Sequence, residues 1–106
     1  MVEPLYTADD AYLALKHFIT HDYDEDVELY PGITFRFRVA GHILGSALVN
    51  LMIEENGKKT KLIFTGDVGQ PNVPILDDPH QISGADFIIT ESTYGNRLHE
   101  QIDREK

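Results

Sequence analysis

The sequence contains no cysteine, and that absence excludes disulfide bonds and thiolate metal sites. A chain without cysteine suits a reducing compartment. No run of about 18 apolar residues is present, so no membrane span is expected. The first residues, Met1 to Pro4, also lack the basic and apolar regions of a secretory signal. We therefore expect a cytoplasmic protein with no membrane partner.

Basic side chains are also few. The chain has 9 lysines and arginines against 18 aspartates and glutamates, and its formal net charge is −9. Such a surface repels a polyanion on average, which argues against binding nucleic acid. The objection is removed if divalent metal ions neutralise clustered carboxylates, or if basic surface lies on sequence outside these residues.

What the chain does contain is the pattern of one small α/β domain of 106 residues. Thr7 before two aspartates is a helix start, and an apolar stripe predicts a helix over Ala8 to Ile19. The aspartates of Asp22 to Asp26 resemble the opening of a calcium loop. Valine and isoleucine stand where that loop needs glycine and glutamate, so we interpret this segment as a solvated acidic turn.

From Ile33 onward the pattern is typical of β-structure. Strands are predicted over Ile33 to Val39, Ala47 to Ile53, Lys61 to Thr65 and Phe87 to Ile89. Tight turns are predicted at Pro31-Gly32 and Asn56-Gly57, and a long loop over Gly69 to Gly84. The run Ala47 to Ile53 is so apolar that we expect it to be covered on both faces. The expected architecture is a mainly antiparallel sheet of about five strands with the N-terminal helix packed on it.

Three polar residues share one placement, because His42, Asp67 and Glu91 each follow a predicted strand. They are spaced 25 and 24 residues apart, as suits neighbouring strands of one sheet. Strand ends are where ligands gather in layered α/β folds. We therefore expect the three side chains to converge on one edge.

Histidine and aspartate are suitable ligands for zinc or manganese, and an aspartate has two oxygens with which to bridge two ions. A catalytic zinc usually takes three protein ligands, and this chain offers two. The residue types alone leave a plainer alternative open: a hydrogen-bonded structural His42, an ordinary turn at Asp67 and a capping carboxylate at Glu91.

The remaining histidines have weaker claims. His17 and His21, four residues apart near the end of the predicted helix, could bind a metal but are better interpreted as solvated groups there. His80 and His99 lie in no recognisable pattern. The glycines around His42 lack the Lys-Ser/Thr ending of a phosphate-binding loop.

Three segments taken together resemble the metallo-β-lactamase/β-CASP family of RNA-processing nucleases. They are Ala40-Gly-His-Ile-Leu-Gly-Ser-Ala47, Phe64-Thr-Gly-Asp-Val-Gly69 and Glu91-Ser-Thr-Tyr-Gly-Asn-Arg97. The resemblance implies a partial metallo-β-lactamase αβ/βα sandwich, with residues 1–106 forming the C-terminal part of that domain and ending where the β-CASP domain begins.

By the same resemblance, His42 is a ligand to one of two divalent metal ions, with zinc the expected metal, and Asp67 bridges both. Glu91 supports a histidine of the second domain near the leaving group. The implied substrate is RNA, with DNA left open. The family's main ligand cluster, His-x-His-x-Asp-His, is not in these residues, so we expect the 106 residues alone to bind metal weakly and to be inactive. A non-catalytic scaffold in an RNA-processing complex and another metallo-β-lactamase-fold hydrolase are the alternatives.

Overall fold

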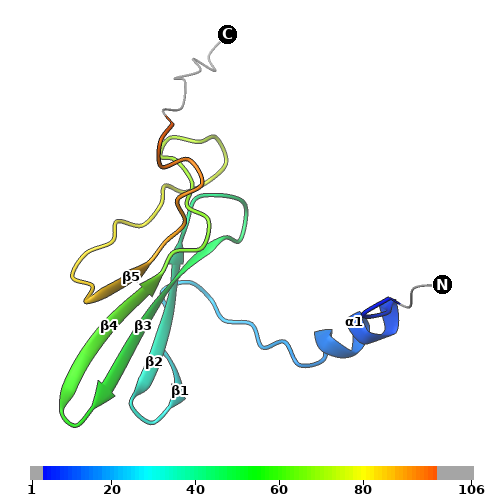
Figure 1. The fold of residues 1–106 in the computed structure, drawn as a ribbon, viewed down its shortest axis with the longest axis horizontal. Helices are drawn as coiled ribbons and strands as arrows, with labels where there is room; N and C mark the ends of the chain where they lie inside the picture. Colours follow the sequence, from blue (N-terminus) through cyan, green and yellow to red (C-terminus); the bar gives the residue numbers. More distant parts are fainter. Residues whose placement is uncertain (1–3, 98–106) are drawn as a thin grey trace.

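The computed structural model describes residues 4–97, which form one helix and a five-stranded sheet (Figure 1). The elements are α1 (Ala8–Leu15), β1 (Val27–Tyr30), β2 (Ile33–Val39), β3 (Ala47–Glu55), β4 (Lys58–Phe64) and β5 (Phe87–Ile89). In the part of the chain that is described, no helix is long and apolar enough to cross a membrane.

The sheet has the strand order β1-β2-β3-β4-β5, antiparallel from β1 to β4 and parallel between β4 and β5. The predicted mainly antiparallel sheet is therefore confirmed. The hairpin between β3 and β4 turns at Asn56 and Gly57, whose φ angles of 52° and 75° are those of the tight turn that Asn-Gly predicts. Strand β1 was missed, because its Val-Glu-Leu-Tyr sequence is too short to show an alternation.

Helix α1 begins as predicted but ends earlier and stands away from the sheet (Figure 1). Thr7 and Asp10 form a reciprocal capping box. The helix ends at Leu15, four residues before Ile19, and none of its residues is buried. The predicted packing of this helix on the sheet is wrong. The apolar stripe is interrupted, since Phe18 and Ile19 lie in the irregular segment after the helix and do not extend its face.

The acidic turn is tied to the sheet. Asp26 pairs with Arg36 and Asp24 pairs with Arg38, both arginines lying on β2. The backbone at Tyr23 also forms a bridge with Phe37. The side chains of Asp26 and Asp24 are 59% and 61% exposed, as the interpretation of a solvated acidic turn requires, and each also forms an ion pair with an arginine of β2.

The sheet is a single layer with one strongly apolar face. Register places alternate residues of β2 on the same face as residues of β3, β4 and β5. We call this set the apolar face: Ile33, Phe35, Phe37, Val39, Val49, Leu51, Ile53, Leu62, Phe64, Phe87 and Ile89. Phe64, Phe87 and Ile89 are 48%, 61% and 51% exposed. The expectation that β3 is covered on both faces is wrong, since only Leu48 in that strand is buried. Among residues 4–97, the buried residues are Phe35, Ala40, Gly41, Leu48, Ile63 and Thr65.

Candidate metal centre at three strand ends

Strands β2, β4 and β5 end at the same edge of the sheet. Because β2 and β4 are each antiparallel to β3, they run in the same direction, and β5 is parallel to β4. The three loops that follow them therefore gather at that edge, at the upper end of the strands in Figure 1. They carry His42, Asp67 and Glu91, so the predicted convergence occurs.

His42 and Asp67 meet across two of these loops. The Nε2 atom of His42 lies 3.7 Å from the Oδ2 atom of Asp67, and the side chains are 45% and 70% exposed. Two ligands that each lie about 2 Å from one zinc ion are at most about 4 Å apart. The separation and the imidazole and carboxylate donors thus fit one shared metal ion. Among residues 4–97 no group of three or more histidine, aspartate or glutamate side chains that could hold a metal ion is assembled.

The loop that presents His42 is closed by Ser46. Its Oγ accepts from the backbone N–H groups of His42 and Ile43, at 3.1 and 3.3 Å. The loop turns at Gly41 and Gly45, whose φ angles of 65° and 83° favour glycine. Glycine is therefore suited to both positions that flank the His42 turn.

The loop that presents Asp67 starts from the buried Thr65. The Thr65 N–H donates to the carbonyl of Ile89 at 3.0 Å, and its hydroxyl lies 3.2 Å from that of Thr90. These contacts continue the β4–β5 pairing beyond the strands. They fix the point from which Gly66 and Asp67 leave the sheet.

The His42 and Asp67 loops also touch directly. The Gly69 N–H donates to the Ala40 carbonyl at 2.9 Å. A Cβ atom added at Gly69 would overlap the Gly41 carbonyl and lie 2.6 Å from the backbone nitrogen of His42. A Cβ added at Gly41 would lie 2.8 Å from Pro79. Only glycine permits this approach, which brings the two candidate ligands together.

Glu91 joins the third loop to the second. Its Oε1 accepts from the Val68 N–H at 2.9 Å, one residue after Asp67. This hydrogen bond, with a smaller contribution from the Thr93 side chain and from the nearby His42, holds the pKa of Glu91 below its usual value of 4.5. Glu91 is therefore ionised at neutral pH and serves as an acceptor.

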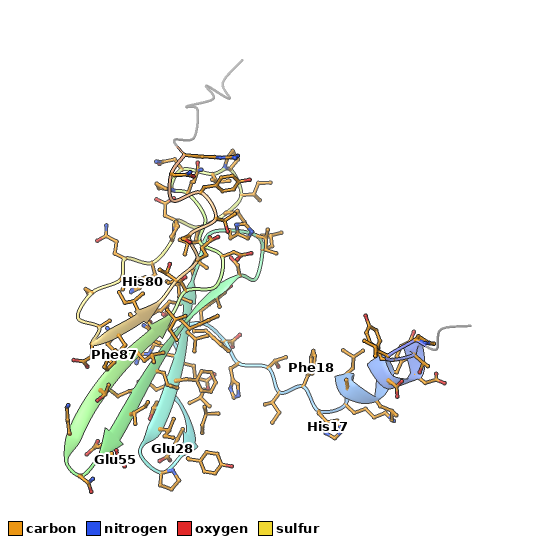
Figure 2. All side chains as sticks on the ribbon, in the orientation of Figure 1. His17, Phe18, Glu28, Glu55, His80 and Phe87 are labelled. Carbon is orange, nitrogen blue, oxygen red and sulfur yellow. The ribbon has the colours of Figure 1, made fainter. Side chains whose placement is uncertain are left out.

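The other histidines do not join this group. His21 lies 3.8 Å from Glu25 and makes an edge contact with Phe35. His17 is exposed just beyond α1, away from the sheet (Figure 2). The backbone N–H of His80 donates to the Val39 carbonyl at 2.9 Å, and its side chain is exposed. His99 lies outside the described residues.

Comparison with known proteins decides the family. Over 99 residues, 93% of this chain, the sequence is 34% identical to ribonuclease TTHA0252 of Thermus thermophilus. It is 35% identical over 94 residues to an RNase J-like protein of Methanocaldococcus jannaschii, which covers 88% of the chain. The chain belongs to the β-CASP ribonuclease family.

A third β-CASP relative carries a different name. Transcription termination factor FttA of Thermococcus kodakarensis is 36% identical over 106 residues, 99% of this chain. The chain spans only 22%, 21% and 16% of these three relatives. No family model matches the chain. The matched length is that of a segment of a β-CASP nuclease.

Residue types alone did not reveal three supports of this β-CASP segment: Ser46, Gly69 and the backbone of Val68. A serine immediately before a strand and after a glycine is a recognisable signal for a hydroxyl that closes the preceding loop. The contact between Gly69 and Gly41 joins positions 28 residues apart, and no local pattern predicts it.

Proposed function

We propose that this chain forms one wall of a metal-dependent site that hydrolyses RNA phosphodiester bonds, within a protein several times its length. The observation that carries the proposal is the 3.7 Å approach of His42 to Asp67 at a sheet edge. The loops after β2 and β4 bring the His42 Nε2 atom and the Asp67 Oδ2 atom close to each other. The names of the ribonuclease relatives support RNA as the substrate.

The nitrogen and oxygen atoms that His42 and Asp67 offer determine the part we propose for each residue. Bound divalent ions, with zinc expected, would lower the pKa of a water molecule and offset phosphate charge. His42 and Asp67 would hold those ions, and Asp67 has a second oxygen with which to bridge them. The ions would also cancel part of the net charge of −9 that opposes binding of RNA.

Glu91 has a supporting part in the proposed reaction. Because its pKa is lowered, it holds no proton at neutral pH and cannot itself protonate the departing oxygen. It can accept a hydrogen bond from a donor group and so orient that group towards the leaving oxygen. Such a donor would come from sequence outside residues 4–97.

A role in transcription termination is the second candidate, supported by the relatives named FttA. The two candidates share the same site, since a termination factor can act by cutting the transcript. They differ in whether cleavage depends on a transcribing polymerase.

The test uses the full-length protein that carries this segment, incubated with a labelled RNA and with zinc or manganese. We expect metal-dependent cleavage by the wild type. His42→Ala and Asp67→Asn should each lower the rate by more than about a hundredfold, because even the groups that support metal ligands contribute 10–100-fold. His17→Ala is the matched control and should cleave as the wild type does. Absence of cleavage by the wild type would leave only a scaffold role. Full activity in both ligand variants would show that His42 and Asp67 do not hold the metal.

A further inference from the structure

The loop between β2 and β3 is organised by one serine that has no assigned role in the chemistry. The backbone nitrogen, the carbonyl oxygen and the Oγ atom of Ser46 all form hydrogen bonds with residues of this loop. Its Oγ accepts from the N–H groups of His42 and Ile43, and its own N–H donates to the Ile43 carbonyl at 3.1 Å. Its carbonyl accepts from the Ala40 N–H at 3.2 Å. A serine hydroxyl has two acceptor positions, and both are occupied here.

His42 depends on this loop for its position. Its side chain is 45% exposed, so packing of neighbouring side chains holds the ring only in part. Glycine residues on either side, at Gly41 and Gly45, give the backbone access to conformations that other residues avoid. The hydroxyl of Ser46 restricts this backbone freedom, because it accepts hydrogen bonds from two successive backbone N–H groups, those of His42 and Ile43.

An outer residue continues the same network. The hydroxyl of Tyr23 donates to the Ser46 carbonyl at 2.9 Å, from the segment that runs along the edge of β2. The Tyr23 hydroxyl therefore anchors Ser46 to a part of the chain 23 residues away. The loop is fixed from its inside by the hydroxyl and from its outside by this contact.

We infer that Ser46 is a positioning residue for metal binding, which sets the direction of His42 through the backbone, with Tyr23 as its outer anchor. The inference rests on the proposed function, because it assigns Ser46 to the same metal site. Removing a group that hydrogen-bonds to a metal ligand commonly lowers the metal affinity by 10–100-fold. Here the partner acts on the backbone of the ligand instead of on its ring.

The experiment compares Ser46→Ala, Ser46→Thr and Tyr23→Phe in the full-length protein, with Ser83→Ala as control. Ser83 lies in the loop before β5, where its carbonyl accepts from Lys61. Zinc affinity is measured by competition with a chromophoric chelator. We expect Ser46→Ala to lose at least about tenfold, Tyr23→Phe a smaller factor, and Ser46→Thr, which keeps a hydroxyl, less than about threefold.

Two further readouts separate positioning from general loss of structure. Amide exchange at His42 and Ile43, measured without metal, should become faster in Ser46→Ala while exchange in β3 stays unchanged. Cleavage by Ser46→Ala should recover when the metal concentration is raised, which loss of a reacting group would not allow.

Equal zinc affinity in wild type and Ser46→Ala would overturn the role of Ser46 and leave the proposed function intact. A wild type that binds no zinc or manganese would overturn the proposed function. The amide exchange would then report separately on whether Ser46 orders the loop. If Ser46→Ala does not fold, Tyr23→Phe decides, and unchanged zinc affinity in that variant would overturn the inference.

Discussion

The Oε1 atom of Glu91 accepts a hydrogen bond from the backbone N–H of Val68 at 2.9 Å, and so joins the end of β5 to the loop that carries Asp67. The contact spans 23 residues of sequence. An ionised carboxylate makes a stronger acceptor than a neutral one. The position of Asp67 therefore depends on the charge of Glu91.

The pH dependence of stability follows from this contact. The pKa of Glu91 is lowered in the folded protein, first by the Val68 N–H. Its contribution is therefore present above the usual value of 4.5 and is lost as the pH falls through the lower folded value. Glu91→Gln has no charge to lose, so its thermal midpoint should fall less steeply than that of the wild type as the pH is lowered through this acidic range. Glu28→Gln, on β1, is the control and should keep the wild-type profile; an unchanged slope in Glu91→Gln would contradict the prediction.

Gly69→Ala should separate the two candidate ligands. The new methyl group would overlap the Gly41 carbonyl, and overpacking of this kind costs about 1–3 kcal/mol. We expect zinc affinity to fall by about tenfold or more, because the loop of His42 must move. Gly84→Ala is the matched control: its φ of 61° is also unfavourable for alanine, at about 1–2 kcal/mol, but nothing lies within 4 Å of the added atom. Gly84→Ala should therefore lose stability and keep zinc affinity. Equal affinity in both variants would show that the contact of Gly69 with Gly41 does not set the site.

The apolar face predicts how the 106-residue polypeptide behaves alone. Exposed contiguous apolar surface promotes association. We expect it to self-associate and to bind the dye ANS, and we expect Phe64→Ser with Phe87→Ser to reduce both signals. Leu13→Ser, on α1 and with 55% of the leucine exposed, is the control and should change neither. Sedimentation that shows a monomer without dye binding would contradict the prediction.

Helix α1 should unfold independently of the sheet. It has no buried residue, so its stability depends on local terms such as the capping box of Thr7 with Asp10. Thr7→Ala should cost about 1 kcal/mol of helix stability. Amide exchange over residues 8–15 should become faster, while the free energy of global unfolding changes by less than about 0.5 kcal/mol. A larger global loss would show that α1 packs on the sheet after all.

Local patterns predicted much of the fold. The alternation of Ile33 to Val39 gave the limits of β2, and the apolar run Phe87 to Ile89 those of β5. Asn56-Gly57 predicted its hairpin because few other dipeptides favour two successive positive φ angles. The helix was predicted too long, because the apolar residues Phe18 and Ile19 continue the spacing in the sequence. The backbone after Leu15 makes tighter turns instead, the last with the Phe18 N–H donating to the Leu15 carbonyl at 3.3 Å.

The sequence by itself determined which residues can carry the chemistry: a histidine between glycines, an aspartate and a glutamate, each directly after a strand. It also determined the resemblance to β-CASP nucleases, because that depends on residue types in order. Only the tertiary structure decided that His42 and Asp67 come within 3.7 Å, and that Ser46, Gly69 and the Val68 amide hold them there. Those contacts depend on the direction of three strands and on a backbone approach between distant glycines, which no local pattern encodes.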